Sequence, residues 1–389
     1  MQASLEALGR YRLEISPFGK LTIESPSQAF FDPFVQALAS ASLGRGQARI
    51  ACYGGSHTAS DLYTSTLREA LQMGFGNLGR GFTMPVPIYE DYWQAGVRIH
   101  PSEGISTLEP SPKRRAPDAY GIAGVAFEAR GKARAHIQSD GSTFSRLGIL
   151  YWAQPGGGKL EAEIDGITHT FSTASPSPRP QAHLFALKDS EHDMILRPQG
   201  DGPVRLFGLV LEKEGAGVLV DQFGVAGAKA RHHLLWQEES WAELLAWRRP
   251  DLVLFAYGNN ELTEGHVPVE THAQDFERMM RRFRSRFPEI ACLVIGPFGA
   301  TSALVSMNDL VALNRAYRQI AFRFSCGFID VLRWQGGPGA TSRLQRWLPP
   351  LARDDGIHFT EAGYRAFGAA LTTAILEKAR ERIAQHTWH

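Results

Sequence analysis

Residues 48–59 read Ala-Arg-Ile-Ala-Cys-Tyr-Gly-Gly-Ser-His-Thr-Ala, and this stretch decides the fold. Residues 48–53 are mostly small or apolar and predict a strand, whereas residues 59–73 have the spacing of an amphipathic helix. The two glycines between them permit a sharp turn. We therefore expect Ser56 at the carboxyl end of a strand and beside a helix N-terminus, where free backbone N–H groups can receive an anion. This is a suitable place for a nucleophile, although most Gly-Ser turns are only turns.

An alternation of strands and helices resumes after Gly215. Strands are expected over residues 218–223, 251–257, 291–295 and 327–332, and helices over 240–247, 269–287, 308–324 and 361–379. The strand at 251–257 is almost wholly apolar, as expected when both faces of a sheet are covered. At the N-terminus we expect a short hairpin over residues 11–23 and a helix over residues 29–41. The pattern predicts a parallel sheet with helices on both faces.

The segment from residue 85 to residue 215 has a different texture. Short β-like runs are separated by clusters of Gly, Pro, Asp and Ser, and Asp165-Gly166 between two of them is a hairpin turn signal. Several short strands at this spacing predict a β-sandwich. We therefore expect a discontinuous catalytic domain, residues 1–84 and 216–389, with residues 85–215 inserted as a β-sandwich domain.

Composition excludes several classes of partner. The 389 residues include 41 basic and 40 acidic side chains, so the net charge of +1 indicates neither a nucleic acid nor an anionic membrane as partner. No apolar run is long enough to span a bilayer. Residues 1–10 lack a basic stretch followed by an apolar core, so no signal peptide is visible and the compartment stays open. The oligomeric state is likewise open.

The three cysteines form neither a disulfide framework nor a metal-knuckle pattern. Cys52 and Cys292 fall in expected strands and are interpreted as small core residues. His232 and His233 are adjacent and lack an evident third ligand, so no metal site is predicted. Residues 74–79 match a dinucleotide-binding pattern but follow a helix, so no cofactor is predicted either.

Three stretches at expected strand ends complete a possible site. Gly227 follows the strand at 218–223, and its N–H could point at a substrate oxygen. Asn260 follows the strand at 251–257 and could donate its amide to an oxyanion. Asp355 lies three residues before His358, so the acid could orient this histidine as the base that activates Ser56. Asp354 is the alternative residue for the orienting role. A nucleophile, an oriented base and oxyanion donors are what acyl transfer requires.

These residues resemble the SGNH (GDSL-type) hydrolase family, whose blocks contain Ser, Gly, Asn and Asp-x-x-His in this order. Block one here is Gly-Gly-Ser-His-Thr-Ala and block three is Gly-Asn-Asn-Glu. The Ser-His-Thr-Ala form, followed by a β-rich insertion, is similar to the peptidoglycan O-acetylesterase branch. The resemblance implies a three-layer α/β/α catalytic domain and an inserted jelly-roll or carbohydrate-binding-like domain. It also implies the triad Ser56, Asp355 and His358, and an oxyanion hole of Ser56, Gly227 and Asn260.

The function expected from the resemblance is a serine esterase that removes O-acetyl groups from an O-acetylated polysaccharide, with peptidoglycan as the first choice. A polysaccharide O-acetyltransferase using the same triad is one alternative, and a catalytically weakened carbohydrate-binding module is another. The resemblance favours the periplasm or cell surface. No cofactor or metal is implied.

One departure from the family motif concerns the residue before the serine. The family usually has Asp there, and this chain has Gly55, which could loosen the serine turn because glycine adds conformational freedom. Aromatic residues offer possible sugar platforms. Tyr89, Tyr92 and Trp93 are expected near the mouth of the site. Tyr151 and Trp152 alternate on a strand, so at most one of them should be exposed.

Overall fold

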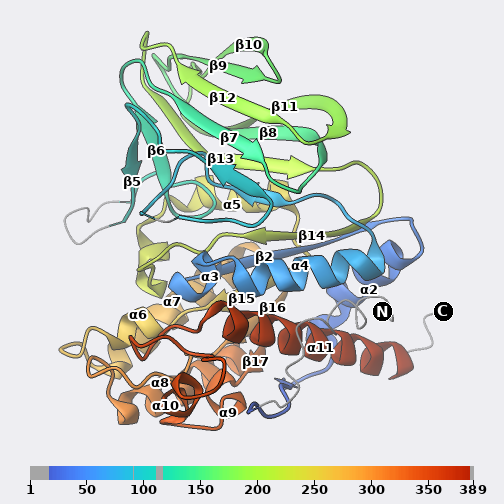
Figure 1. The fold of residues 1–389 in the computed structure, drawn as a ribbon, viewed down its shortest axis with the longest axis vertical. Coiled ribbons are helices and arrows are strands. Elements are labelled where there is room, and N and C mark those ends of the chain that lie inside the picture. The colour runs from blue at the N-terminus through green and yellow to red at the C-terminus, as the bar shows by residue number, and fades with distance from the viewer. Residues whose placement is uncertain (1–16, 91, 111–116, 386–389) are drawn as a thin grey trace.

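The computed structural model describes residues 17–90, 92–110 and 117–385. Residues 11–16 of the hairpin expected over residues 11–23 lie outside these ranges, and in the described part the strand β1 (Ile23–Glu24) pairs with β17 (Gly327–Ile329). Two stacked parts are visible: antiparallel sheets lie above a layered arrangement of helices and a parallel sheet (Figure 1).

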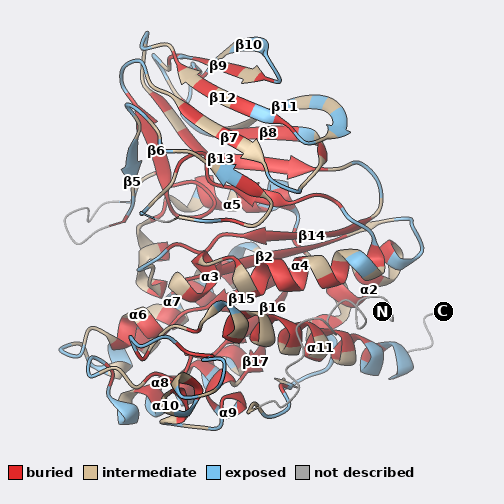
Figure 2. Ribbon diagram, viewed as in Figure 1, coloured by how far each residue is buried: buried red, intermediate tan, exposed pale blue. Residues whose placement is uncertain are grey.

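The lower part is built on a six-stranded sheet with the order β1-β17-β16-β15-β2-β14. All neighbouring pairs are parallel except β1 with β17. Its strands are β1 (Ile23–Glu24), β2 (Gln47–Gly54), β14 (Gly217–Gln222), β15 (Leu252–Ala256), β16 (Ala291–Ile295) and β17 (Gly327–Ile329). Every residue of β14, β15, β16 and β17 is buried, as the red strands of Figure 2 show. The expected parallel sheet is confirmed.

Helices cover both faces of this sheet. One layer holds α2 (Asp32–Ser42), α4 (Leu62–Phe75) and α11 (Glu361–Gln385), and the other holds α5 (Glu238–Arg248), α7 (Val269–Arg286) and α8 (Met307–Arg323). Strand alternation explains the two cores, because successive side chains point to opposite faces. Ile50 and Cys52 of β2 pack with the first layer, whereas Ala51 and Tyr53 pack with the second. The fold is therefore the expected three-layer α/β/α arrangement.

The upper part consists of two antiparallel sheets. The first has β10 (Ile167–Ser172), β9 (Lys159–Ile164), β12 (Asp193–Pro198), β7 (Ala135–Ser139) and β4 (Val97–Ile99). The second has β11 (Arg179–Ser190), β8 (Phe144–Ala153), β13 (Val204–Glu212), β6 (Ala126–Ala129) and β5 (Ser106–Leu108), with β3 (Gly81–Thr83) on β13. Asp165 and Gly166, at φ 52° and 79°, form the tight turn between β9 and β10. The chain thus carries a β region inserted between parts of the α/β fold.

The two parts share apolar contacts. The ring of Phe223, just after β14, lies 5.0 Å from Tyr53 of the parallel sheet and 4.9 Å from Phe82 of β3. The expected boundary at residue 84 falls immediately after β3, although β3 already pairs with β13 of the antiparallel sheet. The division into residues 1–84 with 216–389 and residues 85–215 therefore stays a prediction.

Tyr151 and Trp152 are both buried, at 5% and 8% exposure, which agrees with the expectation that at most one would be exposed and leaves neither as a sugar platform. One expectation about a single residue is wrong. Cys292 is not merely a core residue: it forms a disulfide with Cys326, between β16 and the residue before β17. Cys52 is a buried free thiol, as expected.

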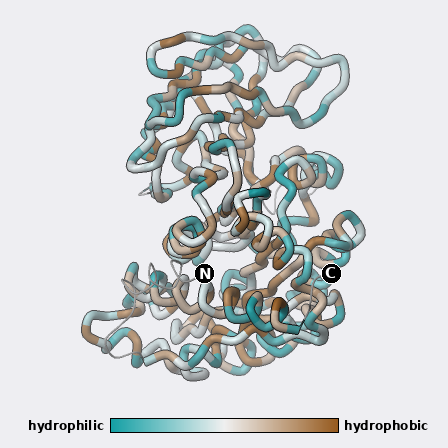
Figure 3. Tube along the Cα trace, turned by 90° about the vertical axis from the view of Figure 1, so that its right-hand side faces the viewer, coloured by the Kyte–Doolittle hydropathy of each residue, from teal (hydrophilic) through white to brown (hydrophobic). Residues whose placement is uncertain are grey.

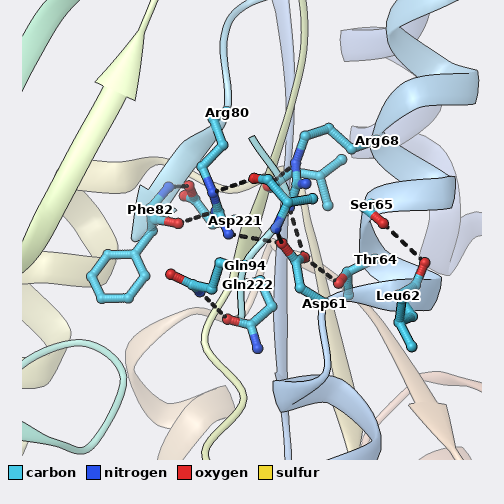
Figure 4. Close-up of polar contacts among 12 residues, drawn as sticks. Asp61, Leu62, Thr64, Ser65, Arg68, Arg80, Phe82, Gln94, Asp221 and Gln222 are labelled. Carbon is cyan, nitrogen blue, oxygen red and sulfur yellow. Dashed lines mark hydrogen bonds and ion pairs between the residues drawn. The ribbon is translucent and has the colours of Figure 1, made fainter. Parts of the chain in front are cut away.

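The helix expected over residues 59–73 is broken at Asp61. A short helix, α3 (Ser56–Ala59), precedes the break and α4 follows it, with Asp61 in the left-handed region at φ 51°. The fully buried Asp61 carboxylate accepts hydrogen bonds from Arg68 and Arg80 at 3.1 and 2.8 Å, as Figure 4 shows. A buried charge needs such partners. The break therefore aims the carboxylate at two cations that local periodicity does not reveal.

No helix among the described residues is long and apolar enough to cross a membrane. Hydrophobic residues occur in short runs throughout the trace in Figure 3, which is the pattern of strands and helices that each contribute one part of a shared core.

Candidate active site

The turn after β2 places Ser56 at the carboxyl edge of the parallel sheet. Ser56 is the first residue of α3, so its N–H has no acceptor within that helix. The turn is held to both neighbouring strands, because Gly55 N–H donates to the carbonyl of Ala256 at 3.4 Å and Val225 N–H donates to the carbonyl of Gly54 at 3.0 Å. Ligands of parallel sheets bind beyond this edge.

Ser56, His358 and Asp355 lie in one chain of hydrogen bonds. The Oγ atom of Ser56 is 2.8 Å from Nε2 of His358, and Nδ1 of His358 is 2.8 Å from Oδ2 of Asp355. The serine comes from the turn after β2, whereas the other two residues precede α11. The arrangement can move the serine proton to an imidazole whose tautomer is fixed by a carboxylate.

Asp355 also fixes its own loop. Its Oδ1 accepts the N–H groups of Ile357 and His358 at 2.8 and 2.9 Å. Burial opposes ionisation of Asp355, but these donors and the His358 side chain outweigh it and hold the pKa of the carboxyl below its ordinary value. Between the two acids that the sequence left in competition, Asp355 contacts His358, and Asp354 has no such contact.

Gly227 lies in a turn beside the serine. Ala228 N–H donates to the carbonyl of Val225 at 3.0 Å, and Gly227 has φ +77°, a value that favours glycine. Ala226 lines the cleft that contains Ser56, whereas Gly227 lines a smaller hollow of about 140 Å³ that shares Ala226 with it. Its assignment as an oxyanion donor remains a prediction.

Asn260 lies directly over Gly55. It belongs to α6 (Asn259–Leu262) after β15, and its Nδ2 donates to the carbonyl of Ala228 at 2.9 Å, which leaves its second amide hydrogen for another acceptor. A Cβ atom on Gly55 would be only 2.4 Å from this nitrogen. Gly55 has a negative φ of −85°, and the Asn260 amide occupies the space that a side chain at this position would take.

Glu261 joins the loops that carry Gly227 and Asn260, and the sequence analysis did not single it out. Its two carboxylate oxygens accept the N–H groups of Ala230 at 2.8 Å and Gly258 at 2.9 Å. Burial raises the pKa of this carboxyl, against the N–H donors that lower it. Its position in the quoted block Gly-Asn-Asn-Glu was the available signal.

His57 supports the site from behind. It is buried, its Nδ1 is 2.8 Å from the hydroxyl of Tyr364, and its ring stacks on Phe298 with centroids 4.1 Å apart. The ring centroid of His358 lies 5.2 Å away. Burial, with the nearby His358, lowers the pKa of His57 well below its ordinary value, so this ring is neutral at pH 7. These contacts give His57 a structural role behind the triad.

A pair of glutamines links the serine turn to the segment that leads into the β region (Figure 4). Gln222, the last residue of β14, donates to the carbonyl of Thr58 in α3 at 2.8 Å and accepts from Gln94 at 3.0 Å. Gln94 in turn accepts the N–H of Met84 at 3.1 Å. These buried contacts join α3 to β14 and to the segment that leads into the β region.

A cleft of about 570 Å³ opens over the triad. It is lined by Ser56, Ser60, Leu62, Tyr89, Glu90, Trp93, Ala226, Arg353, His358 and Tyr364. Tyr89 and Trp93 are 38% and 45% exposed there, whereas Tyr92 packs edge-on against Tyr89. Two of the three aromatic residues expected at the mouth of the site therefore line it.

Comparison with known families agrees with this geometry. Residues 195–366 match the model of the GDSL-like Lipase/Acylhydrolase family. The matched stretch includes Gly227, Asn260, Asp355 and His358, and Ser56 lies outside it. A search of curated protein sequences gives no match.

A solved structure shows the same fold. One described as "Peptidoglycan O-acetylesterase in action" superposes with a TM-score of 0.75 at 22% identity, covering 93% of this chain and 100% of that one. A lipase/acylhydrolase from Enterococcus faecalis has a TM-score of only 0.32 at 19% identity, over 42% of this chain and 77% of that one. The first comparison shows the SGNH hydrolase fold over nearly the whole chain, and residues 195–366 are similar to the GDSL-like Lipase/Acylhydrolase family.

Proposed function

We propose that this protein, a carboxylic ester hydrolase of the SGNH (GDSL-type) fold, is a serine acetylesterase that removes O-acetyl groups from peptidoglycan or a related polysaccharide. The observation that carries the proposal is the chain of two 2.8 Å hydrogen bonds from Ser56 through His358 to Asp355, open to a cleft.

The chemistry follows from the positions of the groups. The Oγ of Ser56 attacks the acetyl carbonyl carbon while Nε2 of His358 takes its proton, and Asp355 stabilises the imidazolium. The oxyanion is held by the N–H groups of Ser56 and Gly227 and the amide of Asn260, each worth roughly 3 kcal/mol to the transition state. His358 then protonates the leaving sugar oxygen. Water attacks the acetyl-Ser56 ester with the same base, and acetate leaves.

Three observations support a glycan ester as substrate. The cleft, at about 570 Å³, has room for more than an acetyl group. Tyr89 and Trp93 present partly exposed rings, which suit the apolar faces of sugars. A solved peptidoglycan O-acetylesterase has this fold over nearly the whole chain.

The disulfide bears on the compartment. Cys292 and Cys326 are bonded, and such a bond persists where thiols are not kept reduced. Together with a wall polymer as substrate, this favours the cell envelope, so we propose that the protein works in the periplasm or at the cell surface.

The test is acetate release from O-acetylated peptidoglycan by the wild type and Ser56→Ala. We expect release by the wild type and a loss of at least about a thousandfold in the variant, because the nucleophile is gone. Ser60→Ala is the matched control, since it removes another hydroxyl from the same cleft and leaves the hydrogen bond between Ser56 and His358 in place.

Two further assays, one with a small acetyl ester and one with an added oligosaccharide, distinguish the alternatives. Release from a small activated acetyl ester without release from any glycan would keep the esterase and refute the polysaccharide. Transfer of acetyl to an added oligosaccharide in preference to water would replace the hydrolase by the acetyltransferase. Retention of full activity by Ser56→Ala would refute the mechanism.

A further inference from the structure

The cleft over Ser56 has two differently charged walls. One wall carries Tyr89, Glu90 and Trp93 from the segment before β4, and the other carries Arg353, His358 and Tyr364. The proposed chemistry uses His358 from this set and leaves Arg353 and Glu90 without a role.

Arg353 is fixed beside the base. Its N–H donates to the carbonyl of His358 at 2.8 Å, and its own carbonyl accepts from Gly356 N–H at 3.2 Å and from Gln345 at 2.8 Å. An antiparallel bridge between Ala352 and Phe359 closes the same loop. All these bonds use the Arg353 backbone. Its side chain can therefore be changed without removing what positions His358.

The guanidinium of Arg353 has no carboxylate partner among the residues that the structure describes, and the side chain is exposed. The buried guanidinium groups of Arg68 and Arg80 differ from it, because both form ion pairs with Asp61. The Arg353 charge acts on both walls: burial raises the pKa values of Tyr89 and Tyr364, and Arg353 opposes that rise at each. An unneutralised guanidinium in a cleft suits an oxyanion that accepts two parallel hydrogen bonds, and a carboxylate is such a group on acidic sugars.

Glu90 limits what else the cleft accepts. Its exposed carboxylate also lines the cleft and accepts hydrogen bonds from hydroxyl or amide N–H groups. The ligand that fits both walls has one acidic group towards Arg353 and neutral polar groups towards Glu90, with a sugar face against Trp93.

We propose that Arg353 is a specificity-determining residue that binds a free carboxylate on the glycan, so that the preferred substrates are O-acetylated acidic sugars. This rests on the proposed esterase function and narrows its substrate class. Two sources of the carboxylate share this chemistry: a uronic acid, or the lactyl ether of muramic acid. In peptidoglycan the lactyl carboxyl is free only after hydrolysis of the amide that joins it to the stem peptide, so a reaction of that class would have to supply the substrate.

The test measures binding and not turnover, so that it is independent of the esterase reaction. Ser56→Ala protein is titrated calorimetrically with the disaccharide N-acetylglucosaminyl-N-acetylmuramic acid, and with the same disaccharide amidated at its lactyl carboxyl. A trisaccharide of galacturonic acid and its methyl ester form the second pair. The carboxyl groups are ionised in one member of each pair and are blocked as a neutral amide or methyl ester in the other.

We expect the acidic member of at least one pair to bind about ten- to a hundredfold more tightly, the range of a hydrogen-bonded charge pair. Adding Arg353→Gln should remove this preference and leave the affinity for the neutral member unchanged. Arg346→Gln, which removes an exposed arginine outside the cleft, is the matched control and should keep the preference.

The pair that shows the preference identifies the source of the carboxylate. Equal binding of the acidic and neutral members, no binding of any probe, or a preference that survives Arg353→Gln would overturn the inference. The acetyl ester assay with wild-type protein decides the proposed function separately, because a protein that ignores the carboxylate can still release acetate.

Discussion

Gly55 stands where the family motif has Asp, and restoring a side chain there should reduce activity. A Cβ atom at position 55 would lie 2.4 Å from Nδ2 of Asn260, whereas an ordinary contact needs about 3.4 Å or more. The amide must therefore withdraw by roughly 1 Å, which is enough to remove a hydrogen bond to an oxyanion. Loss of one such donor costs about 2.7–4 kcal/mol, or roughly 10²–10³ in rate. We expect this loss in kcat for both Gly55→Ala and Gly55→Asp.

A double-mutant cycle makes the test specific. The assay is the steady-state hydrolysis of 4-nitrophenyl acetate by wild type, Gly55→Ala, Asn260→Ala and the double variant. Because Asn260→Ala removes the atom that the new Cβ would meet, Gly55→Ala should have little further effect in that background. Only the carbonyl of Ala228, at 3.3 Å, would remain close to the new methyl group. Wild-type activity in Gly55→Ala, or an equal loss in both backgrounds, would refute the reasoning.

Three other perturbations have outcomes that the structure sets. Asp61→Asn leaves two buried guanidinium groups without their carboxylate, so the free energy of unfolding should fall by about 3–5 kcal/mol and Tm by about 4–6 °C in a thermal melt. Burial alone would raise the pKa of Asp61, but its two arginines and the Thr64 hydroxyl lower it below the ordinary value. The contribution of Asp61 to the free energy of unfolding is therefore fully present above about pH 5 and is lost as acid protonates the carboxylate of the folded protein. The difference in stability between wild type and variant should shrink below about pH 4. Asp355→Asn should reduce kcat about 10³- to 10⁴-fold with an unchanged melting curve, and a loss under tenfold would contradict its orienting role. Cys326→Ser opens a loop of 34 residues and should lower the free energy of unfolding, measured in urea, by about 2–4 kcal/mol. A reductant should destabilise only the wild type. Equal stability of the two proteins under oxidising conditions would contradict this prediction.

The sequence predicted the parts of the fold that local chemistry determines. The strand at Leu252–Ala256 is apolar on both faces because helices cover both faces of the sheet. In the sequence this gives a continuous run of apolar residues. The turn at Asp165-Gly166 has positive φ values at both residues, and the dipeptide Asp-Gly is typical of such a turn. The order of the blocks placed Ser56, Asp355 and His358 at the edge where they now form one hydrogen-bonded chain.

Long-range contacts account for what the sequence analysis missed. The helix break at Asp61 is explained by Arg80 and by the N–H of Ala95, which donates to the Asp61 carboxylate at 3.0 Å, and no local pattern refers to either. The atom that a Cβ at position 55 would meet belongs to Asn260, which follows a different strand. The pairing of Cys292 with Cys326 depends on two strand ends being neighbours, which spacing in the sequence does not reveal.

The measurement that tests the central claim most directly is the identification of the residue that carries the acetyl group during turnover. Wild-type protein is mixed with excess 4-nitrophenyl acetate, quenched in acid within the first turnovers, digested and analysed by peptide mass spectrometry. The account predicts an acetyl group on Ser56 that forms with a burst of nitrophenol and is absent from Ser56→Ala. Acetylation of a different residue with full turnover by Ser56→Ala would contradict it.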